Sequence, residues 1–425
     1  MKSIPKGYKK TEVGIIPDEW EFCCIVDKQI LNESSIQTGP FGTLLKASEY
    51  TSTGIPVISV REIRDGYILI FDETPFIGVH TCKRLPQFIL EEGDIVFARK
   101  GGVDRSAIVR EKYGTLYLGS DGIRLRFKKE NPEYLAFWFH SGLFKKELLQ
   151  NATGTIMANM SQEIMSHLPL LLPPPPEQKA IAEVLSDMDA LIEAQKELIA
   201  KKRDIKQGTM QDLLSGRVRL PGYETKSWKH TDIGDIPDDW EVKSFSNIAY
   251  LIKETVDPTS NKSLNCVELE HLSSSTGLLI DFDDLSNKSS FKNKFQRGDV
   301  LFGKLRSYLR KFWLCQWSGC CSTEIWVFRP KSITNSVFLK YIVSSDQFVK
   351  VASESFGTHM PRADWNVVKE CFFAIPALYS EQQAIAQVLS DMDDELETLE
   401  VELEKLNHMK RGMMQELLTG RIRLI

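Results

Sequence analysis

The stretch EQKAIAEVLSDMDA at residues 177–190 returns almost unchanged as EQQAIAQVLSDMDD at residues 381–394. The likeness extends over residues 177–220 and 381–424, which align without a gap and end alike in MQDLLSGRVRL and MQELLTGRIRL. In the second copy, apolar residues alternate four and three positions apart, the heptad pattern of a helix that packs against another helix. Both copies are therefore predicted to be long helices.

The apolar heptad residues are those predicted to face a partner helix. They are Ile181, Leu185, Met188, Ile192, Ile199, Ile385, Leu389, Met392, Leu396, Leu399, Leu403 and Leu406. Gln195 and Lys202 interrupt the first stripe, and Leu191, Leu198 and Ile205 form a second apolar line beside it. We expect the two helices to pair antiparallel, because the second must return the chain towards its start. Two separate helical caps, each on its own domain, are the alternative.

Local signals set the expected helix ends. Ser380 followed by Gln383 predicts a capping box at the start of the second helix. A proline run leads into the first helix, and Pro176 suits a first helical turn. Gly216 and Gly420 stand where a helix would stop in a left-handed residue.

A second echo lies upstream of each helix. YKKTEVGIIPDEWE, from Tyr8, matches WKHTDIGDIPDDWE, from Trp228. The chain is therefore predicted to consist of two variable domains, at residues 1–175 and 221–380, each followed by a helical segment. The helical segments are predicted at residues 176–220 and 381–425.

Both variable domains are predicted to be mixed. GIPVISVREI, DIVFARK, IRLRF, VLFGKL and IWVFRP are typical of strands, with β-branched residues and bounding glycines. PEYLAFWFHSGLFKKELLQ and VFLKYIVSSDQFVKVASE are typical of amphipathic helices. The predicted class is α+β, with two mixed α/β domains separated by two long paired helices and related by an internal pseudo-twofold repeat.

Composition restricts the function classes. The net charge of −5 comes from the last segment, since residues 381–425 carry ten acidic and five basic side chains. The larger segments are neutral on balance, which permits a local basic face. The eight cysteines form no CxxC pair and the seven histidines no HExxH, so we expect no metal site and no disulfide framework. No apolar run is long enough to span a bilayer, and a cytoplasmic protein is expected.

The known catalytic signatures are missing from the sequence. It contains no phosphate-binding GxxxxGK[ST], no GxGxxG after a strand, no GxSxG and no Asp/Asn-Pro-Pro-aromatic tetrapeptide. IPDDWEVK offers Asp238, Glu241 and Lys243 as a nuclease-like set, but their spacing is too short for convergence on a metal. A structural strand above a buried Trp20 or Trp240 explains the motif better. We therefore expect no catalytic residue in this chain.

Basic and polar residues gather at loop-like positions that recur in both domains. FARKGGVDRS faces FGKLRSYLRK, and GTIMANMS faces GTHMPR. Arginine forks and lysines bind phosphates, and arginine or lysine can read a guanine edge. A solvated surface loop explains any one cluster, whereas recurrence in both copies favours DNA binding. The predicted DNA contacts are Gln37, Thr38, Lys46, Arg61, Arg99, Lys100, Arg105, Thr155, Asn159, Lys253, Lys304, Arg306, Arg310, Thr358, His359 and Arg362.

The whole chain resembles the specificity subunit of type I restriction–modification systems. The resemblance rests on PPPPEQKAIAEVLSDMDALI and YSEQQAIAQVLSDMDDEL, on the endings LLSGRVRL and LLTGRIRL, and on the openings IPDEWE and IPDDWE. GTIMANMS ahead of the proline run is a further match. In that family each globular domain is a target recognition domain for one half of a split DNA sequence, and paired helices set the spacing.

The resemblance also implies partners. Two modification subunits would dock on the helices and carry S-adenosylmethionine, and two restriction subunits would supply ATP- and Mg-dependent cleavage. This chain would then be non-catalytic and would bind no cofactor itself. The first domain has TGPFGTLLKASEYTSTGIPVISV where the second has NKSLNCVELEHLSSSTGLLI, so an asymmetric target is expected.

Two other classes of function remain open at this point. A coiled-coil scaffold that never touches DNA would fail to shift random-sequence DNA libraries when assembled with its partners. A nuclease or fused methyltransferase would bind a cofactor as a lone chain. The missing motifs argue against the second of these classes.

Overall fold

The chain folds as two compact units, each built from one globular domain and part of each long helix. The first unit contains residues 1–194 and 403–425, and the second contains residues 195–402. The computed structural model describes residues 4–42, 44–152, 160–225, 227–258, 264–288, 290–354 and 361–424. Among these residues, no helix combines the length and hydropathy needed to cross a membrane.

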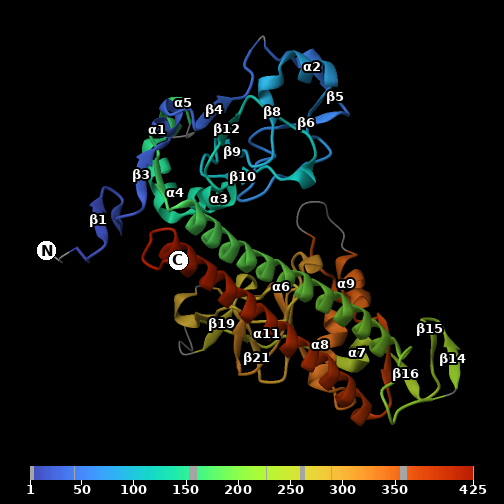
Figure 1. Cartoon of the computed structure of the whole chain (residues 1–425). Helices are drawn as coiled ribbons and strands as arrows, with labels where there is room; N and C mark the ends of the chain where they lie inside the picture. Colours follow the sequence, from blue (N-terminus) through green and yellow to red (C-terminus); the bar gives the residue numbers. More distant parts are fainter. Residues whose placement is uncertain are drawn as a thin grey trace. The chain divides into compact units, whose positions relative to one another are not determined.

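The two repeated stretches are long helices, as predicted. They are α6 (Pro175–Ser215) and α11 (Tyr379–Leu417), each drawn as one continuous ribbon in Figure 1. Gly216 and Gly420 follow them with φ of 72° and 69°, the left-handed geometry expected at the end of a helix. The predicted capping box at Ser380 is wrong, because α11 already begins at Tyr379 and Ser380 lies inside its first turn.

A four-stranded antiparallel sheet forms the centre of the first unit, in the order β10-β9-β12-β4. A second sheet has the order β5-β7-β6-β11-β8, with β6 and β11 parallel. Two short pairs, β1-β2 and β3-β13, complete the strands of this unit. The strand bounds are β1 Tyr8–Thr11, β2 Gly14–Pro17, β3 Glu21–Cys24, β4 Ser34–Thr38, β5 Tyr50–Thr51, β6 Ile55–Ile58, β7 Phe76–Ile77, β8 Ile89–Leu90, β9 Ile95–Ala98, β10 Ser106–Ile108, β11 Leu116–Leu118, β12 Gly122–Phe127 and β13 Pro169–Leu172.

The second unit repeats this plan. Its four-stranded sheet has the order β17-β25-β22-β23, its five-stranded sheet the order β18-β21-β24-β19-β20, and its short pairs are β14-β15 and β16-β26. The strand bounds are β14 Trp228–Thr231, β15 Gly234–Pro237, β16 Trp240–Ser244, β17 Ala249–Ile252, β18 Thr255–Val256, β19 Asn265–Val267, β20 Asp283–Asp284, β21 Lys292–Phe295, β22 Val300–Gly303, β23 Phe312–Leu314, β24 Gly319–Cys321, β25 Ile325–Pro330 and β26 Phe372–Pro376. All five stretches predicted as strands contain strands, at β6, β9, β12, β22 and β25.

The two units differ in the outer sheet. Four strands correspond, since β7-β6-β11-β8 matches β20-β19-β24-β21 around a central parallel pair. The fifth strand is at opposite edges, where β5 adjoins β7 in the first unit and β18 adjoins β21 in the second. The sequence divergence early in each domain therefore changes the sheet itself as well as its loops.

Serine residues divide each of the two predicted domain helices. The first stretch forms α3 (Pro132–His140) and α4 (Gly142–Asn151), and the second forms α8 (Ser336–Ser344) and α9 (Asp346–Ser353). Ser141 and Ser345 are extended and accept hydrogen bonds from backbone N–H groups of the following helix, as helix N-caps do. The shorter helices are α1 Ile25–Ile30, α2 Val79–Arg84, α5 Gln162–Ser166, α7 Phe245–Ile248 and α10 Trp365–Val368.

The glutamate that begins each repeat is a buried carboxylate that binds two other segments of its unit. In the first unit Glu177 accepts a hydrogen bond from Trp20 Nε1 (2.9 Å) and two from Arg423, from Nε (2.6 Å) and Nη2 (2.9 Å). In the second unit Glu381 stands in the same relation to Trp240 and Arg219. The start of each long helix is thus bound to the tail that follows the other.

The glutamine that follows each of these glutamates caps a neighbouring helix. Gln178 Oε1 accepts from the N–H of Asn131 at 2.9 Å, and Asn131 is the N-cap of α3. Gln382 Oε1 accepts from the N–H of Asn335, the N-cap of α8, at 3.0 Å. Both glutamine side chains are almost fully buried, so their hydrogen bonds fix each long helix to its own domain.

The predicted helix-facing residues lie on covered surface. Seven of the twelve are buried and the other five are half-buried, whereas Leu191, Leu198 and Ile205 are exposed. In the first unit Lys410 of α11 pairs with Asp189 of α6 at 2.5 Å. In the second unit Lys206 of α6 pairs with Asp393 of α11. In the repeat, Asp189 is equivalent to Asp393 and Lys206 is equivalent to Lys410. The two ion pairs are therefore the same contact, formed once in each unit.

The two polar residues that interrupt the first stripe also contact the facing helix. Gln195 Nε2 donates to the carbonyl oxygen of Leu399 at 3.1 Å, and Lys202 pairs with Glu395 at 2.6 Å. Both contacts lie within the second unit. The interruptions therefore replace apolar packing with hydrogen bonds and charge pairs.

Asp393 is expected to make the second unit sensitive to acid. Burial opposes ionisation of this carboxyl group, but Lys340 and Lys206 outweigh it and hold its pKa below the ordinary value of 3.8. A lowered pKa stabilises the fold above the unfolded-state value and loses that effect as the pH falls below about 4. Asp393→Asn should lower stability at pH 7 by about 2 kcal/mol, since the hydrogen bonds from Lys206 and Lys340 to the charged carboxylate are mostly buried and the amide keeps their geometry only in part.

The measurement is thermal unfolding at pH 7 and at about pH 2.5, which is below the ordinary carboxyl pKa. The difference between wild type and Asp393→Asn should shrink at the lower pH. Asp394→Asn is the control, because Asp394 is exposed and adjacent. Equal effects of the two substitutions would show that the buried pair does not stabilise the unit.

Candidate nucleic-acid interface

Three strand ends of the first unit meet at one edge of its four-stranded sheet. Thr38 ends β4 and pairs with Ile123, and Ala98 ends β9 and pairs with Gly122 at the start of β12. Arg99 directly follows β9 at this edge. The edge therefore gathers residues that are far apart in the sequence.

Backbone hydrogen bonds hold Arg99 from both sides. Its N–H donates to the carbonyl oxygen of Asp121 at 2.8 Å, and its own carbonyl oxygen accepts from the N–H of Met160 at 2.9 Å. The backbone of Arg99 is thus fixed between the residue that precedes β12 and a segment downstream of α4. A side chain on such a backbone is presented from a rigid support.

The second unit builds the same edge. Lys304 directly follows β22; its N–H donates to the carbonyl oxygen of Glu324 at 3.0 Å, and its carbonyl oxygen accepts from the N–H of Ala363 at 2.9 Å. Glu324 precedes β25 as Asp121 precedes β12. Arg99 and Lys304 are therefore structural equivalents, as the aligned sequences predict.

Aromatic and acidic partners surround the cations of the first edge. The Arg99 guanidinium lies 4.5 Å from the ring centroid of Phe41, and its Nε donates to the Met160 carbonyl oxygen at 3.2 Å. Lys100 pairs with Asp121 at 3.1 Å, and both side chains are partly exposed. Arg105 turns back towards the carbonyl oxygen of Gly102 at 3.4 Å. Phe41 and Asp121 were not predicted from sequence.

The cations of the second edge divide into bound and unbound groups. Arg310 is bound to Asp346, and Arg362 pairs with Glu324 at 3.0 Å. For Lys304 and Arg306, no hydrogen bond or ion pair joins the side chain to any residue that the structure describes. Arg306 and the neighbouring Tyr308 are exposed.

The five-stranded sheet of the first unit lies against this edge where Gly39, after β4, contacts Gly119, after β11. A Cβ on Gly39 would lie 1.8 Å from the carbonyl oxygen of Gly119, so only glycine allows the exit of β4 to cross the exit of β11. Gly119 also donates its N–H to the carbonyl oxygen of Ile58 at the end of β6. Arg61 follows β6 by three residues and is 65% exposed in its side chain.

The other predicted contacts are placed less uniformly. Gln37 is half-buried on β4 and donates to the carbonyl oxygen of Thr38, whose hydroxyl accepts from Gln162 at 3.0 Å. Lys46 is exposed, and its backbone N–H donates to Glu49. Lys253 is exposed directly after β17. Four predicted contacts lie outside the described residues: Thr155, Asn159, Thr358 and His359.

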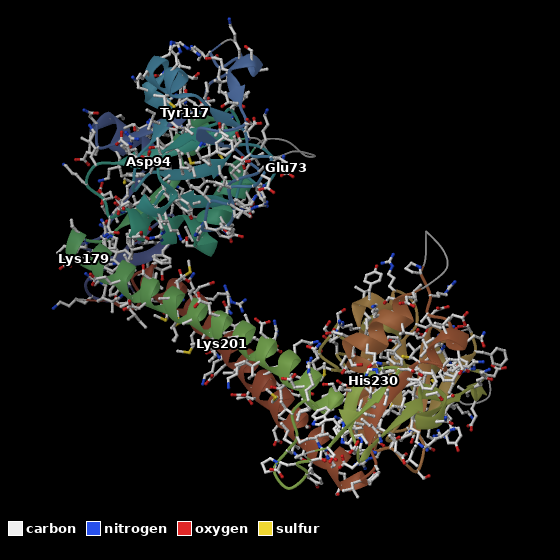
Figure 2. The ribbon with its side chains drawn as sticks, turned by 90° about the vertical axis from the view of Figure 1, so that its right-hand side faces the viewer. Glu73, Asp94, Tyr117, Lys179, Lys201 and His230 are labelled. Carbon is white, nitrogen blue, oxygen red and sulfur yellow. The ribbon has the colours of Figure 1, made fainter. Side chains whose placement is uncertain are left out.

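Some arginines of these sheets have a structural role instead. Asp94, labelled inside the first unit in Figure 2, is buried and accepts from Arg126 through both carboxylate oxygens. Asp299 accepts from Arg329 in the same way, with both distances 2.9 Å. These pairs explain the recurrent Gly-Asp ahead of β9 and β22, and they leave the two arginines unavailable for DNA.

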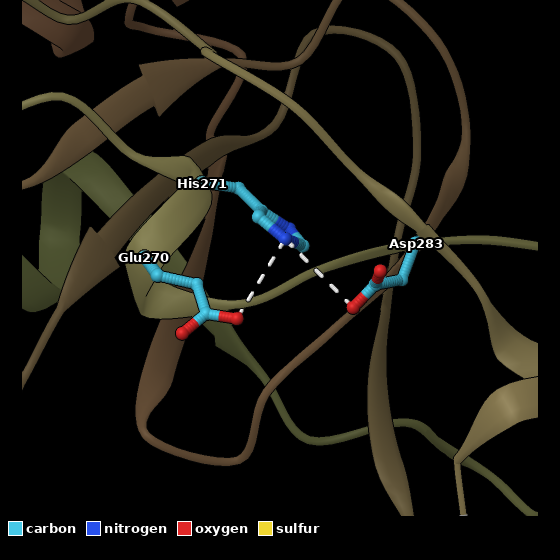
Figure 3. A group of neighbouring side chains, drawn as sticks. All are labelled: Glu270, His271 and Asp283. Carbon is cyan, nitrogen blue, oxygen red and sulfur yellow. Dashed lines mark ion pairs between the residues drawn. The ribbon is translucent and has the colours of Figure 1, made fainter.

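A histidine and two carboxylates lie together in the second unit, where His271 Nε2 is 4.0 Å from Glu270 and 3.7 Å from Asp283 (Figure 3). His271 Nδ1 accepts the N–H of Glu268 at 3.1 Å, so a neutral ring carries its proton on Nε2. That proton occupies the position a metal would need. The Lys288 ammonium also binds Asp283 and lowers the pKa of its carboxyl group. The geometry fits a polar cluster that contains the Lys288–Asp283 ion pair rather than a metal site.

Two repeated domains, each with basic residues at the same sheet edge, are what a chain with two DNA-recognition domains would present. A family model for the type I restriction modification DNA specificity domain matches the chain twice, at residues 36–201 and 237–408. The chain belongs to this family of type I restriction–modification specificity subunits, which are non-catalytic components.

Two relatives that are named as type I specificity subunits align over nearly the whole chain. The putative type I restriction enzyme MjaX specificity subunit of Methanocaldococcus jannaschii is 28% identical, covering 99% of this chain and 97% of its own length. The MjaVIII specificity subunit of the same organism is 26% identical, covering 99% and 96%.

Two solved structures share the fold. A chain from a study of complex assembly and conformational transition in the type I R-M system has a TM-score of 0.55 at 14% identity, covering 96% of this chain and 99% of that one. The S subunit of a type I restriction–modification system from M. genitalium has a TM-score of 0.52 at 13% identity, covering 94% and 96%.

Proposed function

We propose that the two units read the two halves of one bipartite, asymmetric sequence in double-stranded DNA. The observation that carries the proposal is the edge built twice, on Arg99 and on Lys304, with the same backbone hydrogen bonds and different side chains around it. Equivalent supports would place each reader alike on DNA, and unlike side chains would select different bases. The charged residues at the edge of each unit would contact DNA phosphates and so fix the position of the protein on the DNA.

The proposal includes an antiparallel pair of α6 and α11 that sets the distance between the half-sites. The reciprocal ion pairs support it, because Asp189–Lys410 and Asp393–Lys206 are the same contact made twice, as in a two-fold interface. A helix of 41 residues is about 60 Å long at ~1.5 Å per residue. That length exceeds the ~34 Å of one DNA turn, so a spacing of this order is feasible.

The proposed partners are two modification subunits and two restriction subunits. The exposed line of Leu191, Leu198 and Ile205 on α6 is apolar surface that a docked helix would cover. On α11 the repeat-equivalent positions of Leu191 and Leu198 are Glu395 and Glu402, so the two docking faces would differ in charge. S-adenosylmethionine would be bound by the modification subunits, and ATP and Mg by the restriction subunits.

Binding by the lone chain should be weak. Each domain is neutral on balance, and phosphate contacts supply much of the affinity of DNA-binding proteins. We expect the complex with modification subunits to bind target DNA at least about 100-fold more tightly than the lone chain at equal salt. Filter binding of both samples at matched salt measures this ratio, and equal tight binding would contradict the proposed role of the partners.

A further inference from the structure

The turn after Lys304 contains two arginines in a backbone conformation that side chains disfavour. Arg306 has φ of 52° and Arg310 has φ of 49°, and they bracket the short 3-10 turn Ser307–Leu309. A non-glycine residue in this left-handed region is strained and persists where the surrounding structure enforces it. The turn is therefore maintained against a local conformational cost.

Neighbouring elements hold the turn firmly. The Arg306 N–H donates to the carbonyl oxygen of Pro361 at 2.9 Å. Buried Ser307 donates through Oγ to the carbonyl oxygen of Ala352 at 2.8 Å and lies 3.1 Å from Ser353 Oγ. The backbone that carries Arg306 is thus fixed before any ligand arrives, which lowers the entropic cost of binding through its side chain.

The first unit has a glycine at the left-handed position that Arg306 occupies in the second unit. Gly101 follows Arg99 by two residues and has φ of 70°, just as Arg306 follows Lys304 by two residues. The left-handed position is therefore common to both edges, but only the second unit places a side chain there. Arg310 uses its own side chain on Asp346 and on the Ser344 carbonyl oxygen, so its charge has a structural partner. The Arg306 side chain has none among the described residues.

We infer that Arg306 is a specificity-determining residue that reads a guanine in the half-site of the second unit. This rests on the proposed function and adds the base. A guanidinium presents two parallel N–H donors, which match the O6 and N7 acceptors of guanine in the major groove. Lys304, also without a partner among the described residues, would contact the adjacent phosphate. The first unit, with Gly101 at the equivalent position, would lack this contact.

The test compares methylation motifs. The full chain is co-expressed with its modification subunit in a host that lacks adenine methylation, and the methylated motif is read by sequencing. Arg306→Gly installs the residue that the first unit carries at this position, so folding should not suffer and the midpoint of thermal unfolding should be equal or higher. The expected result is that one guanine position of one half-site is relaxed by about 5- to 150-fold, while the other positions persist.

Two further variants make the outcome specific. Arg306→Lys keeps the charge but loses the fork, so it should relax the same guanine. Arg297→Ala removes another exposed arginine from the second unit and should leave the motif unchanged. The inference is overturned if Arg306→Gly leaves the motif intact, or if the position that Arg306→Gly relaxes is not a G·C pair. A wild-type complex without any bipartite motif would instead overturn the proposed function.

Discussion

Inserting one heptad into both long helices should widen the gap between the two half-sites by about three base pairs. Seven residues add about 10 Å to a helix, and base pairs rise about 3.4 Å each. The insertions belong between Ala194 and Gln195 and between Glu402 and Leu403, where the two units divide. A heptad preserves the a/d register on both helices. Methylation-motif sequencing would report the gap directly, with both half-sites unchanged.

A single insertion provides the matched control. A heptad in α6 alone shifts that helix against α11 and removes the match between Asp189 and Lys410 or between Asp393 and Lys206. We expect this variant to lose methylation, or to unfold at lower temperature, without a new motif. If the double insertion leaves the gap as it was, the helices do not set the spacing, and the proposed ruler is wrong.

Glu381→Ala should be among the most destabilising single substitutions in the second unit. The Glu381 side chain is 1% exposed and that of Arg219 is 6% exposed. Removing the carboxylate leaves the guanidinium with Asp239 alone and leaves the Trp240 N–H without its acceptor. Breaking a buried ion pair from one side costs about 3–5 kcal/mol. Chemical denaturation of the full chain would measure the change in the free energy of unfolding.

The first unit offers a parallel test of the same contact. Glu177→Ala should destabilise by a similar but smaller amount, because the Arg423 side chain is 19% exposed. Glu397→Ala on the exposed face of α11 is the control and should change stability by no more than about 0.5 kcal/mol. If Glu381→Ala lowers the free energy of unfolding no more than Glu397→Ala does, then the contact of Arg219, after α6, with the start of α11 does not stabilise the unit.

The features that the sequence predicts correctly are those whose pattern repeats within the chain. The long helices, the central strands and the glycine stops at Gly216 and Gly420 follow from periodicity and from local backbone preferences. Helix boundaries are predicted less well. Ser141 and Ser345 begin new helices inside stretches that look continuous, because an N-cap serine is not distinguished from an ordinary helical serine by hydrophobic periodicity.

At the candidate interface, too, the sequence predicts the residue types but not their contacts. Charge and recurrence predict Arg99, Lys304 and Arg306 as DNA contacts, but the sequence does not distinguish arginines with an ion-pair partner from Arg306, which has none among the described residues. Arg310 and Arg306 are four residues apart in the same turn, yet only the fold shows that Arg310 is bound to Asp346. Phe41 under the Arg99 guanidinium carried no sequence signal, since its partner is distant along the chain.

The sequence by itself determined the duplication, the helical nature of both repeats, the family and the absence of catalytic motifs. These properties depend on residue type and on spacing along the chain, which are local information. Only the tertiary structure decided that each repeated Glu-Gln fastens a helix start to Trp, Arg and a neighbouring N-cap. It also revealed the left-handed backbone at Arg306. Those features arise when segments that are about 45 to 250 residues apart in the sequence meet, and a hydrogen bond or a strained φ depends on that meeting.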